Sequence, residues 1–170
     1  MALPYFFPFL ESGNTITLVH PDLNTLTKIF EGFFDGIKTP FTQKHIKSPP
    51  TFSHPNNIQI PNVAVSHMEL NHPGKSYAYK FTNDNKSIIY ATDNELKPNN
   101  GTHDQAIIDF FNNGDVLIHD AQYVNAEREQ KLDWGHSFLI DVLNVASQSN
   151  IKHLILHHFD PHKNEKDVSI

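Results

Sequence analysis

The sequence contains no cysteine, so neither a disulfide framework nor cysteine ligands for a structural zinc ion are available to its 170 residues. No stretch approaches the roughly 20 consecutive apolar residues of a membrane-spanning helix. The apolar segment 1–8 carries two prolines and no basic residue, which is unlike a secretory signal peptide. We therefore expect a cytoplasmic protein with no membrane partner.

The sequence also lacks the glycine-rich motifs that bind nucleotides, because neither a G-x-G-x-x-G nor a Walker pattern occurs. Its net charge of −6 argues against a broad surface for nucleic-acid phosphates, which needs clustered Lys and Arg. A short nucleotide held in a pocket is compatible with this charge. No His-x-His pair occurs among the twelve histidines, so the densest motif of many zinc sites is absent.

What is present suffices for one domain, which we place at 1–170. The sequence is 38% apolar, and its thirteen phenylalanines supply bulky material for a core. Alternating and helical periodicities predict a first half with mainly antiparallel strands and a second half in which strands and helices alternate. This order predicts an α/β or α+β layered fold, with helices covering a sheet. The expected strands are 14–20, 63–70, 76–82, 87–91, 115–119 and 152–157, and the expected helices are 23–34, 102–112 and 136–149.

Two local details of these elements are predicted as well. Thr102 is the expected cap of the helix 102–112, with Gln105 completing a capping box. The segment 37–57 contains four prolines, and we expect it to be a loop or flap.

Candidate functional residues lie at the ends of the predicted strands and at one helix start. Asp93 ends a strand-like run, His136 lies within Gly135-His136-Ser137, and His157 and His158 end the last strand. Aspartate and histidine held rigidly at such positions are typical ligands of a catalytic zinc ion. The alternative for Asp93 is that it caps a turn and binds no metal.

Other polar residues have two interpretations each. At most one of His157 and His158 can enter a given site, because neighbours on a strand face opposite ways. His136 at a helix start favours a bound anion such as phosphate, or is a surface residue. Asp120 either orients a ligand histidine or forms a turn. His72 lies in a turn, where a histidine is commonly solvated.

Five segments, in this order, resemble the metallo-β-lactamase fold hydrolases, and among them the branch of ribonuclease Z and related phosphodiesterases. The segment Leu3–Pro8 resembles the aromatic stretch that follows the family's His-x-His-x-Asp-His motif. The five segments are His72-Pro73-Gly74-Lys75-Ser76-Tyr77-Ala78-Tyr79-Lys80-Phe81, Ile89-Tyr90-Ala91-Thr92-Asp93-Asn94-Glu95, Asp115-Val116-Leu117-Ile118-His119-Asp120-Ala121-Gln122-Tyr123, Trp134-Gly135-His136-Ser137 and Leu154-Ile155-Leu156-His157-His158-Phe159-Asp160-Pro161.

The resemblance implies a partial αββα sandwich and a hydrolase with two metal ions, zinc or else manganese or iron. It assigns His72, Asp93 and His158 as metal ligands, with Asp93 bridging the ions, and His136 as the residue that handles the scissile phosphate. Asp93 and His136 are thus the implied catalytic residues. The implied substrate is a small phosphodiester or nucleotide rather than extended nucleic acid, and a homodimer is left open.

The His-x-His-x-Asp-His motif that supplies most ligands in this family does not occur in the sequence. We therefore expect the chain to correspond to the later, N-terminally incomplete part of such an enzyme. Three candidate ligands are few for two ions, so we expect weak metal binding and little activity from this chain alone.

Two non-enzymatic interpretations remain open at this point. The chain could be a degenerate, non-catalytic binding or interaction module that keeps inherited ligand residues. It could also use its histidines for a structural zinc ion, but such a site needs a closed set of four ligands, and the sequence has no cysteine and no tight histidine spacing.

Overall fold

The computed structural model describes residues 3–37 and 39–161, in two compact units, Met1–Gln59 and Ile60–Ile170. Both units combine helices and strands, which agrees with the predicted α/β class. That 1–170 forms a single domain stays a prediction. Within the described residues, no helix has both the length and the apolar character needed to cross a membrane.

The first unit packs short helices around phenylalanine side chains. Its core consists of Phe9, Phe30 and Phe34, whose rings meet mainly edge to face. The helix predicted at 23–34 is confirmed, and Asp22 caps it by accepting a hydrogen bond from the Thr25 N–H at 3.0 Å. The elements are η1 Leu3–Tyr5, α1 Phe7–Leu10, β1 Thr17–Val19, α2 Leu23–Phe33, η2 Gln43–His45, β2 Thr51–Ser53 and η3 Pro55–Asn57.

The segment 37–57 is more regular than the predicted loop. It contains β2, which pairs in parallel with β1, and the short turns η2 and η3. Prolines flank β2 on both sides, at Pro49, Pro50 and Pro55, so a strand of three residues lies between signals that normally indicate a loop. Pairing with a distant strand, which a local pattern does not reveal, makes it regular.

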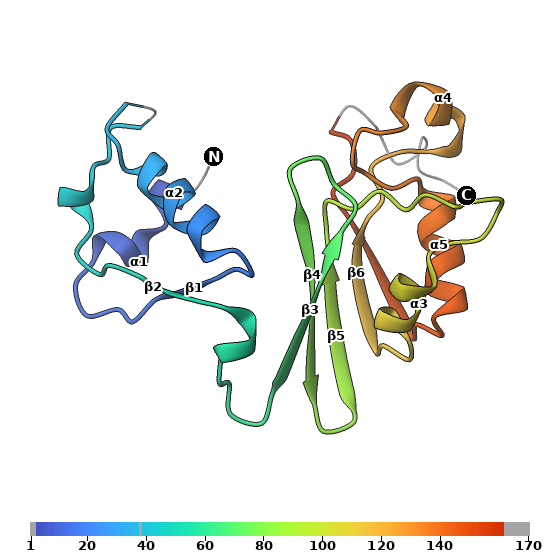
Figure 1. The fold of residues 1–170 in the computed structure, drawn as a ribbon, viewed down its shortest axis with the longest axis horizontal. Coiled ribbons are helices and arrows are strands. Elements are labelled where there is room, and N and C mark those ends of the chain that lie inside the picture. The colour runs from blue at the N-terminus through green and yellow to red at the C-terminus, as the bar shows by residue number, and fades with distance from the viewer. Residues whose placement is uncertain (1–2, 38, 162–170) are drawn as a thin grey trace. The chain divides into compact units, whose positions relative to one another are not determined.

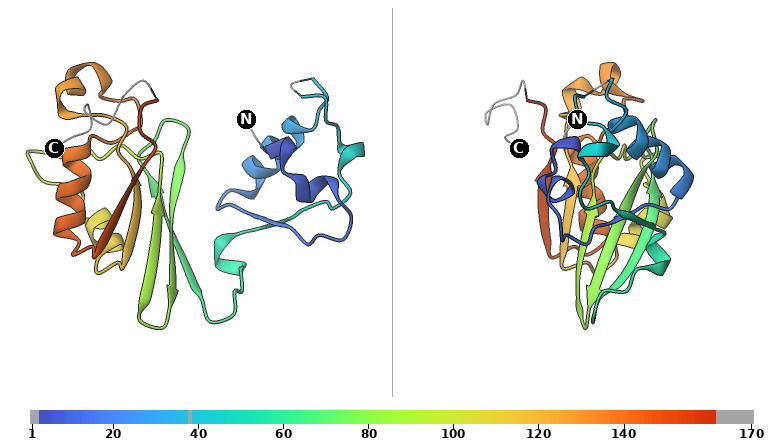
Figure 2. Two further views of the ribbon diagram at one scale, coloured as in Figure 1. Left: turned by 180° about the vertical axis from the view of Figure 1, so that it is seen from behind. Right: turned by 90° about the vertical axis from the view of Figure 1, so that its left-hand side faces the viewer.

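The second unit is a five-stranded sheet in the order β3-β4-β5-β6-β7 (Figures 1 and 2). The first three strands run antiparallel, including the predicted hairpin, whereas β5, β6 and β7 are parallel. The elements are β3 Ala64–Leu70, β4 Ser76–Asn83, β5 Lys86–Ala91, α3 Gln105–Phe111, β6 Val116–Asp120, η4 Asn125–Glu127, α4 Arg128–Lys131, α5 Leu139–Gln148 and β7 His153–His157.

Helices α3 and α5 cover one face of this sheet, as the ribbon views show. Alternation along β5 places Ile89 and Ala91 in the core and leaves Ile88 and Tyr90 exposed. Across from them, α3 and α5 contribute apolar stripes to the same core, with Phe111 and Val142 fully buried. The sheet is therefore fixed in register by one buried face.

Two predicted helix starts were wrong. Both helices begin later in the sequence, because the residues expected to start them form turn or tertiary hydrogen bonds instead. Thr102 pairs with Asn99 in an isolated bridge, so α3 begins later and Asp104 caps it through the Ala106 N–H at 2.9 Å. The second helix begins at Leu139 rather than at 136, because Phe138 bridges Tyr123 in a strand-like pair. Residues 135–137 are therefore loop.

The parallel strands determine where functional groups gather. The carboxyl ends of β5, β6 and β7 meet at one edge of the sheet, which is where open α/β sheets bind ligands. At the opposite edge, Asp115 joins the starts of the same strands. Its carboxylate accepts hydrogen bonds from the Ser87 N–H at 2.8 Å, from Lys152 Nζ at 2.9 Å and from Lys86 Nζ at 3.1 Å.

These partners, Lys152 foremost, hold the pKa of the Asp115 carboxyl well below its usual value of 3.8. A carboxyl whose pKa is depressed by folding stabilises the fold above its unfolded pKa and loses that contribution as the pH falls below it. We expect Asp115→Asn to lower the urea midpoint of unfolding at neutral pH. The difference in midpoint between variant and wild type should shrink as the pH falls from about 5 to about 3. Asp109→Asn, on the exposed face of α3, is the matched control; an unchanged gap at acid pH would contradict the prediction.

Candidate functional site

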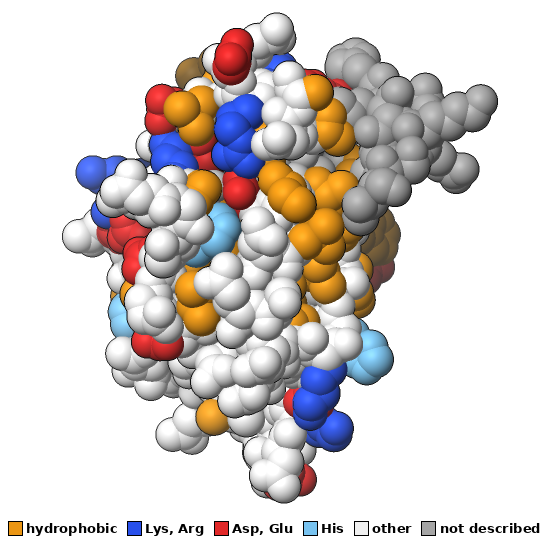
Figure 3. Space-filling view, turned by 90° about the vertical axis from the view of Figure 1, so that its right-hand side faces the viewer, with side chains coloured by type: hydrophobic (Ala, Val, Ile, Leu, Met, Phe, Trp, Pro, Cys, Tyr) orange, Lys and Arg blue, Asp and Glu red, His pale blue; other side chains and the backbone are white. Residues whose placement is uncertain are grey.

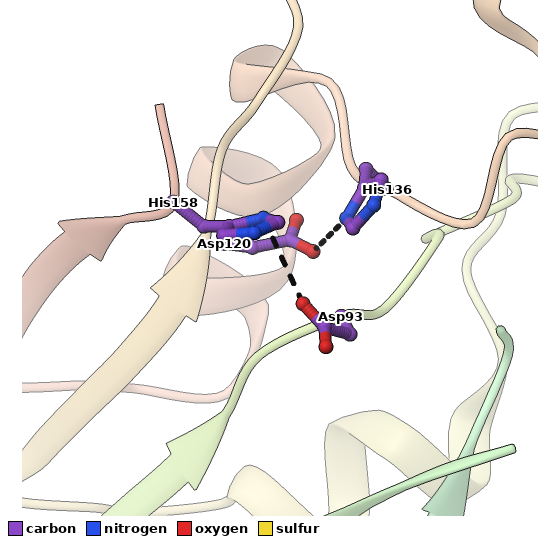
Figure 4. A group of neighbouring side chains, drawn as sticks. All are labelled: Asp93, Asp120, His136 and His158. Atoms are coloured by element: carbon purple, nitrogen blue, oxygen red, sulfur yellow. Dashed lines mark hydrogen bonds and ion pairs between the residues drawn. The ribbon is translucent and has the colours of Figure 1, made fainter. Parts of the chain in front are cut away.

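Four acidic and histidine side chains converge at the carboxyl edge of the second unit's sheet (Figure 4). Asp93, Asp120, His136 and His158 each offer one ligand atom, and these atoms all lie within 4.8 Å of one another. Asp93 lies in the loop after β5, Asp120 ends β6, His136 lies in the loop before α5, and His158 follows β7. Three of the predicted site residues thus come together, joined by Asp120.

Asp93 and His158 face each other through an uncommon backbone conformation. Their φ angles are +56° and +60°, in the left-handed region that side-chain-bearing residues seldom adopt. The turn at each strand end brings His158 Nδ1 to 3.7 Å from Asp93 Oδ1, with side chains that are 39% and 45% exposed. This pair is close enough to share an ion and open enough for a ligand to reach it.

Asp120 is fully buried, and hydrogen bonds already occupy both of its oxygens. Oδ1 accepts from the Ser137 N–H at 2.9 Å, while Oδ2 accepts from the Asn94 N–H at 2.9 Å and lies 3.0 Å from His136 Nδ1. A carboxylate in this position fixes the His136 ring with Nδ1 as the donor. Of the two interpretations of Asp120, the geometry supports the one in which it orients a histidine.

His136 itself differs from the predicted surroundings. It precedes the first residue of α5 by three positions, so the predicted helix start beside it was wrong, and anion binding at His136 stays a prediction. The backbone there is instead tied to the rest of the site: the Ser137 hydroxyl donates to the Asn94 carbonyl at 2.6 Å and accepts from the Leu96 N–H at 3.0 Å. Tertiary hydrogen bonds, rather than helical ones, hold His136 in place.

His72 lies beside the four-residue cluster and outside it. Its ring centroid is 5.4 Å from that of His136, and its Nδ1 accepts from the Gly74 N–H at 3.3 Å. Gly135 packs directly on it, because an added Cβ would lie 2.6 Å from His72 Cδ2. His72 is therefore part of the same region, and its role as a ligand stays a prediction.

Of the two consecutive histidines, only His158 joins the cluster. His157 ends β7, and its ring stacks against that of His158 with centroids 6.1 Å apart. This agrees with the expectation that one of the pair at most enters the site. The ring of His158 also lies 4.7 Å from that of His136.

Two buried residues of the site had no predicted role. Glu95 accepts hydrogen bonds from the Asp133 N–H at 2.7 Å and the Gly135 N–H at 2.9 Å, and its carboxylate pairs with Lys97 at 3.5 Å. Asn94 binds His119, a fully buried imidazole whose pKa is lowered by burial. Both belong to the run that follows β5, and a polar run directly after a buried strand is the signal that could have identified them.

The donor set fits a metal ion of borderline hardness. Asp93 offers a carboxylate and His158 an imidazole, the ligand types found at zinc, manganese and iron sites. Both side chains are partly exposed, whereas the buried Asp120 carboxylate already takes part in three hydrogen bonds. The described residues thus supply part of a coordination shell rather than a closed one.

Comparison with known proteins identifies the family. A family model described as "Beta-lactamase superfamily domain" matches residues 12–159. The chain belongs to the beta-lactamase superfamily. Within it, the ribonuclease Z of Halalkalibacterium halodurans is 38% identical over 52 residues, and that of Brevibacillus brevis is 27% identical over 82 residues. The resemblance to the ribonuclease Z branch is confirmed.

Solved structures of the superfamily share this fold. The metallo-beta-lactamase fold protein YhfI from Bacillus subtilis matches with a TM-score of 0.65 and 15% identity, covering 95% of this chain and 60% of that one. The short form of human tRNase Z matches with a TM-score of 0.63 and 17% identity, covering 93% of this chain and 66% of that one. The predicted metallo-β-lactamase fold class is therefore confirmed.

The chain spans only part of its relatives. The aligned segments cover 31% of this chain and 17% of the H. halodurans protein, and 48% of this chain and 24% of the B. brevis protein. This superfamily member shares its fold with the solved structures, and its activity is a matter for its own residues.

Asp120→Asn tests the role of the buried carboxylate. An amide nitrogen in place of either oxygen faces an N–H donor, which leaves a buried polar group unsatisfied, and such a group costs about 1–3 kcal/mol. We expect a loss of unfolding free energy of that size in urea titrations, and loss of the preference for the Nδ1–H tautomer of His136 in nitrogen NMR spectra. Wild-type stability with an unchanged tautomer would show that Asp120 does not hold His136.

Proposed function

We propose that this chain provides metal-binding and phosphate-handling residues of a metal-dependent phosphodiester hydrolase. The observation that carries the proposal is the convergence of Asp93, His136 and His158 within 4.8 Å in a member of the beta-lactamase superfamily. These residues come from three separate strand ends or loops, and Asp120 holds one of them by a buried hydrogen bond.

Asp93 and His158 are the proposed metal-binding pair, with His72 as the third ligand. In the complete enzyme that the resemblance implies, these residues would help to hold two zinc ions, and manganese or iron would suit the same ligand atoms. When bound, zinc supplies Lewis-acid polarisation of a phosphoryl oxygen and lowers the pKa of a water molecule. The exposure of Asp93 and His158 leaves room for a substrate beside them.

His136 is the proposed proton donor to the leaving oxygen. Its Nδ1 lies 3.0 Å from the Asp120 carboxylate, so the ring is held with Nε2 available to a substrate. The carboxylate holds the ring in one orientation, as in other histidine–aspartate pairs that act in acid–base catalysis. In the proposed step, a proton on Nε2 passes to the leaving oxygen atom, which develops negative charge as its bond to phosphorus breaks.

A small phosphodiester or nucleotide is the proposed substrate. The sequence relatives are named ribonuclease Z, and a solved diphosphatase from the PhnP family shares the fold with a TM-score of 0.56. The net charge of −6 disfavours long nucleic acid, since a phosphate backbone needs a basic surface.

Asp93→Asn tests the reaction without disturbing the backbone, because asparagine tolerates a positive φ as aspartate does. We expect zinc-supplemented wild type to hydrolyse a chromogenic phosphodiester slowly and Asp93→Asn to lose that activity, with an unchanged circular dichroism spectrum. Asp84→Asn is the matched control, since Asp84 is exposed with φ +49° in the hairpin turn. If wild type shows no hydrolysis with any of the three metals, the chain is better described as a non-catalytic binding module.

Zinc affinity gives a second, independent measure. A tetrahedral site needs four ligands, and the described residues bring Asp93 and His158 together with His72 nearby. We expect calorimetry to show weak zinc binding that His158→Asn reduces further, asparagine again suiting the positive φ of this position. Tight stoichiometric zinc in the purified chain would contradict this prediction.

A further inference from the structure

The single tryptophan of the chain, Trp134, lies two residues before His136 and is 56% exposed. An indole is the largest apolar side chain, and leaving half of it in water forgoes much of the free energy of burial. A large aromatic ring exposed this close to a candidate proton donor indicates a surface that binds something.

The backbone on either side of Trp134 is held in a fixed conformation. Asp133 has φ +68° and Gly135 φ +89°, so the left-handed region is used immediately before and after the indole. The buried carboxylate of Glu95 accepts hydrogen bonds from both of these residues, at 2.7 and 2.9 Å. Strained backbone that is held by specific bonds is characteristic of binding and catalytic sites.

This loop also contacts the candidate site directly. A Cβ at Gly135 would lie 2.6 Å from His72 Cδ2 and 2.6 Å from Pro73 Cδ, so no other residue fits there without displacing His72. Trp134 is thus carried by a rigid turn that packs on one candidate ligand and continues into His136.

Aromatic rings connect the indole to His136, and a cation lies over them. Tyr123 contacts Trp134 edge to face at 6.5 Å and His136 at 6.1 Å. Lys131 Nζ lies 3.9 Å from the Trp134 ring centroid and 5.3 Å from that of Tyr123. At the upper end of the face in Figure 3, the level of α4 in Figure 1, charged side chains of both signs lie beside hydrophobic ones.

We propose that Trp134 is a stacking platform for the base of a nucleotide substrate. Lys131, whose ammonium lies over one face of the indole, would leave the opposite face to the base and meet a phosphate. The proposal rests on the phosphodiesterase function above and narrows its substrate class to nucleobase-containing phosphodiesters. A base is the flat aromatic ligand that stacks on an exposed indole, and stacking accepts any base because each has a π face. The chain has a net charge of −6, so a phosphate group needs a nearby positive side chain to bind, and Lys131 supplies that charge.

The single tryptophan makes the test direct, because all indole fluorescence comes from Trp134. AMP and ribose 5-phosphate are titrated into the full chain, with excitation at the red edge of the indole band to avoid absorption by adenine. We expect saturable quenching by AMP and none by ribose 5-phosphate. In proton NMR spectra, the adenine H2 and H8 signals should move upfield in the ring current of the indole.

Substitutions separate stacking from general binding. Trp134→Phe retains an aromatic face and should keep the upfield shifts, whereas Trp134→Leu should abolish them and weaken AMP binding about tenfold, within the range for loss of one stacked base. Ribose 5-phosphate affinity should be equal in all three proteins. Leu132→Ala, at a neighbouring residue that is 47% exposed, is the matched control and should bind AMP as wild type does.

Equal affinity of wild type for AMP and ribose 5-phosphate would refute the platform, even if Trp134→Leu fails to fold. Quenching that depends on protein concentration without AMP would also refute it, and would assign the indole to a contact between copies of the chain. Hydrolysis of phosphodiesters is assayed separately. AMP stacking without any hydrolysis would overturn the proposed function and support the stacking role of Trp134. Hydrolysis without stacking would support the proposed function and overturn the stacking role.

Discussion

A carboxylate with no exposure to water, that of Asp120, connects the parts of the second unit that matter for function. It accepts hydrogen bonds from the backbone of Asn94 and Ser137 and from the ring of His136. A buried charge is tolerated only when such bonds replace its lost hydration. The loop after β5, the end of β6 and the loop before α5 must therefore keep their positions together, and the cluster of ligand-type residues exists because they do.

Side chains at the two ends of the parallel strands β5, β6 and β7 have different roles. At the amino edge, Asp115 binds lysine side chains from β5 and from the segment before β7, and its role is structural. At the carboxyl edge, the side chains of Asp93 and His158 remain partly exposed and less occupied. The hydrogen bonds of Asp115 make one end of the strands rigid, and the exposed ligand atoms of Asp93 and His158 lie at the other end. A binding site on a rigid scaffold requires both properties.

The strands of the second unit could be predicted from the sequence because their apolar alternation is local information. The start of α5 could not, since Ser137 and Phe138 are taken up by bonds to Asp120 and Tyr123, which lie far away in the sequence. Asp93, His136 and His158 were singled out from strand ends and from the family resemblance, and the fold brings them together. Glu95 was missed, because its two bonds to the turn around Trp134 have no counterpart in any local pattern.

Asp93 and His158 each offer a ligand atom from a residue with a left-handed backbone. The residue at each position must therefore suit both a metal ion and a positive φ. Few residues satisfy the conformational demand: glycine most readily, then asparagine and aspartate. Sequence drift at these two sites is consequently directional. If these positions lost the proposed metal-binding role, substitution would lead toward glycine or asparagine rather than alanine, and proteins with those residues would keep the turn without the ligands.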